Sequence, residues 1–177
     1  LVLLSTQRSD RGAYQALFRE QRVHKTYQAI APYRPELGFP REHHSRMQES
    51  GHFIRMHEVA GPPNSHTRLT LLEHNTHWAR YQLEPISGKR HQLRVHMAAL
   101  GIGILGDGLY PEVNDAPEGD FSRPLRLLAQ AITFTDPLTQ QQRHFHSQYT
   151  LGALPPAPEP EPAPSGQQTR QGLPANA

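Results

Sequence analysis

The sequence predicts an α+β domain in which helices flank a mixed, mostly antiparallel β-sheet. Segments with strand periodicity follow one another with only short turns between them, which favours antiparallel pairing. Only two segments have helical periodicity, and they do not alternate regularly with the strands. The chain has 177 residues, of which 36% are hydrophobic, so it suits one domain with a real core.

The first elements are read from residues 1 to 31. The apolar run at residues 1–5 predicts a buried strand, because it is too short to span a bilayer and no charged segment precedes it. A helix follows, with Ser9 or Asp10 as its cap. Residues 23–31 then alternate with a period of two, which predicts a strand. The apolar residues of the helix recur at helical spacing and are Ala13, Tyr14, Leu17 and Phe18.

The middle of the chain predicts a loop and then a run of strands. Residues 33–47 are rich in proline, arginine and histidine and are expected to form a long loop. Strands are expected at residues 53–59, 67–73 and 78–84, because turn sequences such as Gly-Pro-Pro-Asn and His-Asn-Thr separate them. The short turns predict that these strands pair antiparallel.

A second helix is predicted at residues 90–100. Leu93, Met97 and Leu100 form its buried stripe, and Gly101 can end it. Arg90 and Arg94 are four residues apart and so lie on one side of the helix, beside that stripe. Late strands are expected at residues 130–135 and 143–149.

The C-terminal end has a different composition from the rest. From residue 154 to residue 164 prolines alternate with small or acidic residues, which removes backbone donors and favours extended polyproline II structure. The sequence therefore predicts a folded part over residues 1–152 and a Pro-rich disordered tail over residues 153–177.

The charge distribution favours an anionic partner more than the net charge does. The formal net charge is only +2, but cations concentrate locally and can attract phosphate there. The chain has no cysteine, which excludes disulfides and thiolate chemistry and permits a reducing, cytoplasmic location. The two cationic segments contain Arg19, Arg22, Lys25 and Arg34, and Lys89, Arg90 and Arg94.

The second cationic segment lies in a pattern that resembles a signature of the RluA-type pseudouridine synthases. The family pattern Gly-Arg-x-His-Gln-(Ile/Leu)-Arg-x-His is matched from Gly88 to His96, and Leu-Gly-x-Pro-Ile-x-Gly-Asp-x-x-Tyr is matched from Leu100 to Tyr110. Lys89 replaces the usual Arg, which keeps the charge but loses the bidentate geometry. Gly103 replaces the usual Pro, which loosens the turn. A second family motif, Lys-x-Tyr-x-Ala, is similar to Lys25-Thr26-Tyr27-Gln28-Ala29.

The resemblance implies the pseudouridine synthase fold, truncated on its N-terminal side, and isomerisation of uridine to pseudouridine in structured RNA, either rRNA or tRNA. It implies that Arg94 forms an ion pair with a catalytic aspartate and that Tyr27 stacks on the uracil. RNA is the expected partner. No cofactor, metal, DNA or membrane is expected. The implied RNA contacts are Lys25, Lys89, Arg90, His91, Gln92 and His96.

One part of the family pattern is not found in this sequence. The catalytic aspartate of the family lies in a His-Arg-Leu-Asp-Arg-x-Thr-(Ser/Ala)-Gly motif, which the 177 residues do not contain. Asp10 follows the expected first strand and is assigned to helix capping. Asp107 lies between Gly106 and Gly108 and is assigned to a turn. The chain by itself is therefore expected to be inactive, as a clipped part of a parent enzyme.

Three other readings stay open. Twelve histidines invite a metal site, and His144 and His146 would share one face of a strand, but no acidic residue completes a recognisable ligand pattern. A second reading is a non-catalytic RNA-binding module derived from a synthase. The third is a fragment that does not fold stably by itself, because exposed sheet edges and apolar surface favour aggregation.

Overall fold

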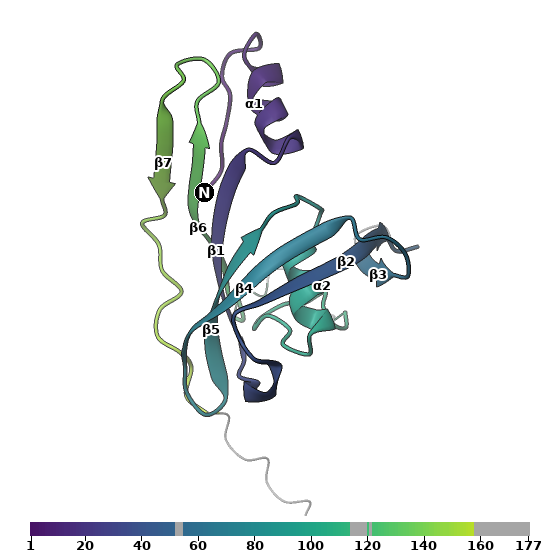
Figure 1. The fold of residues 1–177 in the computed structure, drawn as a ribbon. Helices are drawn as coiled ribbons and strands as arrows, with labels where there is room; N and C mark the ends of the chain where they lie inside the picture. The colour runs from purple at the N-terminus through teal and green to yellow at the C-terminus, as the bar shows by residue number, and fades with distance from the viewer. Residues whose placement is uncertain (52–54, 114–119, 121, 158–177) are drawn as a thin grey trace, which may run out of the picture.

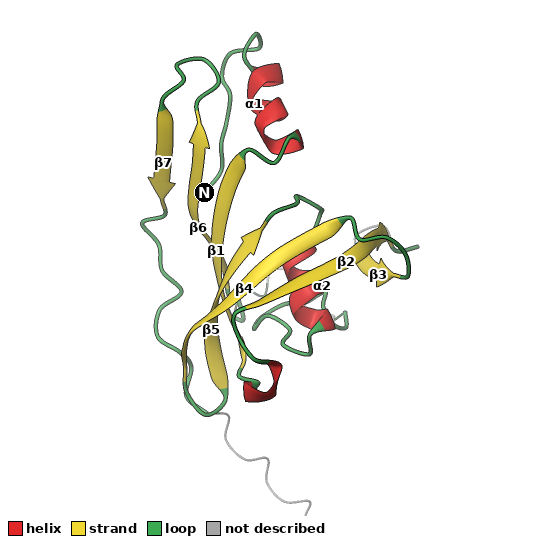
Figure 2. Cartoon of the chain, viewed as in Figure 1, coloured by secondary structure: helices red, strands yellow, loops and turns green. Residues whose placement is uncertain are grey.

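The structure is a computed structural model that describes residues 1–51, 55–113, 120 and 122–157. Its elements are two α-helices, one short 3-10 helix, η1 (Pro35–Leu37), and seven strands; Figure 2 colours the helices and strands. No helix in this described part of the chain is long and apolar enough to cross a membrane. The elements are α1 (Arg11–Arg19), β1 (Val23–Pro32), β2 (Arg41–Glu49), β3 (Met56–Val59), β4 (Ser65–His74), β5 (Trp78–Pro85), α2 (Gln92–Ala99), β6 (Leu127–Thr135) and β7 (Gln142–His146).

The strands form one seven-stranded sheet with the order β3-β2-β4-β5-β1-β6-β7. Every pair of neighbouring strands in it is antiparallel. In Figure 1, α1 lies beside the upper end of β1, whereas α2 lies against the part of the sheet formed by β2, β4 and β5. The predicted α+β class is confirmed, and the sheet is antiparallel at each described pairing rather than mixed.

The main core lies between α2 and the centre of the sheet. Strand β5 alternates strictly between half-buried and buried residues, and Tyr81 and Leu83 are fully buried. Leu93 and Met97 of α2 pack into the same cluster, so the apolar stripe expected for this helix is confirmed. Each such large side chain contributes about 2 kcal/mol of burial free energy, and this packing holds the start of α2 against the strands.

Strand β2 lies inside the segment that was expected to be a loop, so that prediction is wrong from residue 41 onward. Its inward positions include His43 and Ser45, and only Met47 is a buried apolar residue. Both faces of β2 are therefore mostly polar, so the strand has no hydrophobic alternation from which the sequence could predict it. The backbone of β2 is instead held as a strand by its pairing with β3 and β4.

The prediction of a buried strand at residues 1–5 is also wrong, because no strand forms there. Val2 and Leu4 are 83% and 81% exposed. Leu3 alone packs inward, against the small cluster of Leu17 and Phe134 between α1 and β6. An apolar run becomes a strand only where a neighbouring strand offers backbone partners, and none pairs with this segment in the described part of the chain.

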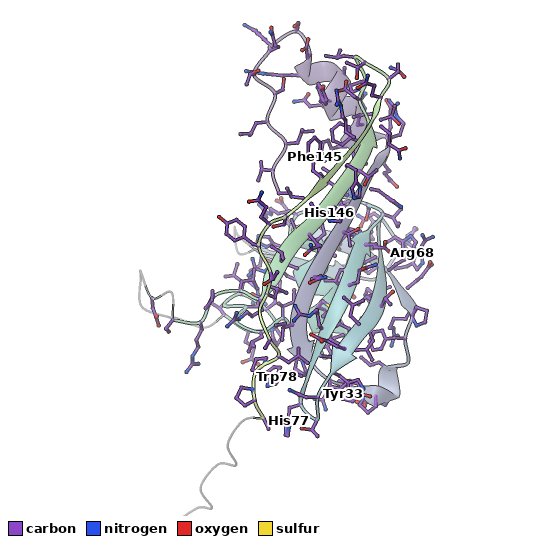
Figure 3. All side chains as sticks on the ribbon, turned by 90° about the vertical axis from the view of Figure 1, so that its left-hand side faces the viewer. Tyr33, Arg68, His77, Trp78, Phe145 and His146 are labelled. Atoms are coloured by element: carbon purple, nitrogen blue, oxygen red, sulfur yellow. The ribbon has the colours of Figure 1, made fainter. Side chains whose placement is uncertain are left out.

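The first residues of the predicted disordered tail are held against the turn between β4 and β5. Asn75 Nδ2 donates to the carbonyl of Pro155 at 2.9 Å, and the indole N–H of Trp78 donates to the carbonyl of Pro156 at 3.2 Å. Figure 3 shows Trp78 beside this end of the chain. The boundary expected at residue 153 stays a prediction: the structure describes residues 153–157, and the rest of the expected tail lies outside the described residues.

Candidate active site

A pocket of about 410 Å³ opens where β1, the loop after β5 and the start of α2 meet. Its lining includes several residues that were predicted as site residues from separate sequence motifs. The described lining contains no Asp or Glu, so its charge is positive. The predicted site residues on its wall are Lys25, Tyr27, Lys89, His91, Gln92 and Arg94.

Lys25 and Tyr27 come from one strand and face the pocket together, because alternate residues of a strand share a side. The Nζ of Lys25 donates to the carbonyl of Ser87 at 3.3 Å, which ties β1 to the loop after β5. Burial lowers the pKa of Lys25 and raises the pKa of Tyr27. The phenol therefore keeps its proton at neutral pH, and its ring forms an uncharged wall.

Gln92 organises the loop that carries Lys89, and it does so from inside the protein. Its Oε1 accepts from the hydroxyl of Ser87 at 2.7 Å and from the backbone N–H of Lys89 at 3.1 Å. Its Nε2 donates to the carbonyl of His66 at 3.0 Å and to Oγ1 of Thr67 at 2.9 Å. Gln92 is only 4% exposed and its amide is already engaged within the protein; the RNA contact expected of it stays a prediction.

His91 stands at the entrance to α2 with a left-handed backbone, φ 54°. Its Nδ1 lies 3.1 Å from the hydroxyl of Tyr110, which itself accepts the backbone N–H of Met56 at 2.7 Å. Burial first, and then the charges of Arg94 and Arg90, lower the pKa of His91. The ring is therefore mostly uncharged at neutral pH and offers hydrogen bonds rather than a cation.

Arg94 is held by an ion pair that the sequence did not reveal. Its Nε donates to Oδ2 of Asp107 at 2.8 Å, and its Nη2 donates to Oδ1 at 2.5 Å. The side chain of Asp107 is fully buried, whereas that of Arg94 is 17% exposed. Arg94 therefore reaches the pocket wall as a cation whose orientation is set by a bidentate partner.

Asp107 also makes the turn that was expected of it, so its carboxylate has two tasks. Oδ1 accepts the backbone N–H of Leu109 at 2.9 Å and that of Tyr110 at 3.1 Å. Gly106 before it has φ 76°, and a Cβ there would lie 2.3 Å from the carbonyl oxygen of Pro124, so only glycine fits. Four hydrogen bonds, three to Oδ1 and one to Oδ2, hold the fully buried carboxylate in this structural role.

His96 and Arg90 lie outside the pocket lining. His96 is fully buried; its Nδ1 lies 2.9 Å from Oγ1 of Thr67, and its Nε2 lies 3.1 Å from Oγ of Ser45. Burial, followed by neighbouring histidines, lowers its pKa to about 3. The ring has no exposed surface, and the RNA contact expected of His96 stays a prediction. Arg90 is 43% exposed and lies 3.5 Å from Glu49.

Comparison with known proteins shows the family to which this chain is similar. A family model described as RNA pseudouridylate synthase matches residues 1–99, more than half of the chain. A dual-specificity RNA pseudouridine synthase RluA from Yersinia pestis is 45% identical over 67 residues, which are 37% of this chain and 31% of that protein. The RluA of Escherichia coli K12 is 50% identical over 60 residues, 33% of this chain and 26% of that protein.

A solved structure supports the same relationship. Human RNA pseudouridylate synthase domain containing 1 superposes with a TM-score of 0.64 at 25% identity, over 80% of this chain and 61% of that one. The chain thus belongs to the RNA pseudouridylate synthase family. Its matched segments span about a third or less of the curated relatives.

Proposed function

We propose that this chain supplies the uridine-binding wall of an RNA pseudouridine synthase that isomerises uridine to pseudouridine in structured rRNA or tRNA. One observation carries the proposal: Tyr27 on β1 and Arg94 on α2, 67 positions apart in sequence, line a single cationic pocket. An aromatic face beside fixed cations suits a flipped base and its phosphates. Such RNA is available in the cytoplasm, where a chain without cysteine tolerates reducing conditions.

The reaction asks little of the protein beyond holding and positioning. The bond from ribose C1′ to N1 breaks, the uracil turns, C1′ joins C5, the proton on C5 is removed, and N1 takes up a proton. In this proposal Tyr27 stacks on the detached base, so that it turns without leaving the site. Arg94, whose Nε and Nη2 pair with Asp107, uses its remaining Nη1 to keep a second acidic side chain charged beside the sugar, because desolvation alone would raise that acid's pKa. The uridine must leave its stack at a cost of a few kcal/mol, which phosphate contacts offset.

The electrostatic part can be tested through salt dependence. Lys89→Ala is expected to weaken binding of a structured rRNA fragment and to reduce the slope of log K against log salt by about 0.7 to 0.9, because one fewer phosphate is neutralised. Fluorescence anisotropy between low and physiological salt measures the slope. Arg143→Ala on the edge strand β7, outside the pocket lining, is the matched control. If Lys89→Ala and Arg143→Ala show equal slopes of log K against log salt, Lys89 does not contact a phosphate.

We also propose that the 177 residues alone do not catalyse the isomerisation of uridine. The described lining of the pocket has no carboxylate, and Asp107, the ion-pair partner of Arg94, has a fully buried side chain that the turn and Arg94 hold in place. Tritium release from RNA labelled at uridine C5 is expected to stay at background with the isolated chain. The same chain is expected to bind that RNA in a gel-shift assay, which is also what a non-catalytic RNA-binding module would do. Measurable release would mean that a carboxylate of this chain is the nucleophile.

Pseudouridine mapping separates the synthase from the binding module. Deleting the gene that encodes this chain is expected to remove pseudouridine from one or a few defined uridines. Re-expression of the gene is expected to restore them, and re-expression with Tyr27→Ala or Arg94→Ala is not. An unchanged pseudouridine map after deletion would favour the non-catalytic module. The variants' thermal melts show whether they fold.

A further inference from the structure

A second polar cluster lies apart from the pocket, where β2, β3 and α2 meet. It consists of His43 from β2, Glu58 from β3 and His96 from α2, and is called here the His-Glu-His cluster. One ligand atom from each residue lies within 4.8 Å of the other two. The sequence separates the three by 15 and 38 positions, so no spacing rule could have joined them.

We propose that the His-Glu-His cluster is a binding site for a divalent transition-metal ion of the Zn²⁺ type. Two imidazole nitrogens and one carboxylate are a common protein ligand set for zinc with one position left open for water. Nothing in uridine isomerisation requires this ion, so the site adds a property to the fold and does not rest on the proposed reaction.

The distances fit one tetrahedral centre. Oε1 of Glu58 lies 2.8 Å from Nε2 of His43 and 3.9 Å from Nε2 of His96. Ligands at the usual zinc distances are about 3.3 Å apart across a tetrahedral angle. The two observed separations lie on either side of that value, so a shift of about half an ångström in each side chain would close the site.

The ring of His96 is oriented as a metal ligand normally is. Its Nδ1 lies 2.9 Å from Oγ1 of Thr67, which also accepts from the amide of Gln92 at 2.9 Å. A donor at Nδ1 leaves the Nε2 lone pair as an acceptor that a metal ion could use, and such partners fix the tautomer of metal-bound histidines. The hydroxyls of Ser65 and Ser45 lie 3.0 Å and 3.1 Å from Nε2, so a metal ion would displace both contacts.

Burial distinguishes this cluster from a second histidine cluster on the same strand. The side chains of His43, Glu58 and His96 are 17%, 27% and 0% exposed. The other cluster, of Glu42, His44 and His66, is largely exposed. Its carboxylate already accepts from Nε of Arg68 at 2.8 Å, and that cation opposes a second one. It therefore serves as an internal control.

The test is isothermal titration of the tag-free 177-residue chain with ZnCl₂ after chelator treatment. One ion per chain is expected to bind, and to raise the midpoint of thermal unfolding by about 5 to 10 °C at a hundredfold excess over Kd. His43→Ala and Glu58→Gln are expected to lower the affinity at least about tenfold. Both replace partly exposed side chains, which spares the buried His96.

His44→Ala is the matched control and is expected to leave zinc affinity and stoichiometry unchanged. The proposal is overturned if no saturable binding occurs, or if His44→Ala abolishes binding while His43→Ala does not. It is also overturned if both variants of the His-Glu-His cluster bind as the parent chain does. Circular dichroism confirms that each variant is folded before titration. None of these outcomes bears on the uridine pocket.

Discussion

Replacing Asp107 with asparagine is expected to lower the free energy of unfolding by about 3 kcal/mol. The asparagine keeps an oxygen for the backbone N–H groups of Leu109 and Tyr110, so the turn is preserved. It removes the negative charge that compensates Arg94, whose guanidinium is only 17% exposed. Breaking one side of such a pair leaves an uncompensated charge in a poorly hydrated place. Urea unfolding followed by circular dichroism measures the loss.

The control for this prediction is an exposed ion pair that also uses the Nε of an arginine, here with a single contact. Arg68 donates through Nε to Glu42 at 2.8 Å, but the two side chains are 52% and 47% exposed. Glu42→Gln is expected to change stability little, because water and salt screen exposed pairs. A cost for Asp107→Asn no larger than that of Glu42→Gln would show that burial does not strengthen the Arg94 pair.

Replacing Gln92 with leucine is expected to cost about 2 to 4 kcal/mol of stability and to weaken RNA binding as well. The leucine removes four hydrogen bonds and leaves buried polar groups of Ser87, Lys89 and His66 without that partner. Each such group that water does not reach costs about 1 to 3 kcal/mol of stability. The loop that presents Lys89 then loses its anchor. Urea unfolding and fluorescence anisotropy measure the two effects.

Gln48→Leu, at an exposed position of β2, is the matched control. It makes the same chemical change where the side-chain amide is exposed to water. It is expected to alter neither quantity much. If Gln92→Leu lowers stability but leaves RNA affinity unchanged at a temperature where the variant is folded, then the loop does not need this anchor to present Lys89.

The sequence by itself determined the features that depend on local order. Residues Leu93 and Met97 recur at helical spacing and form the buried face of α2, and the alternation of residues 78–84 predicts β5. The resemblance to a known family brought Tyr27 and Arg94 forward as partners. Each of these conclusions uses either a periodicity within a few turns or a contiguous motif.

Tertiary structure decided what depends on distant neighbours. Strand β2 has no apolar alternation and is ordered by pairing with β3 and β4, whereas residues 1–5 have the apolar run but no pairing strand. The partner of Arg94 is Asp107 because a glycine turn brings that carboxylate back to α2. The His-Glu-His cluster likewise exists only where three elements converge. Periodicity records which face a side chain takes, but the contact it makes there depends on chain segments many positions away.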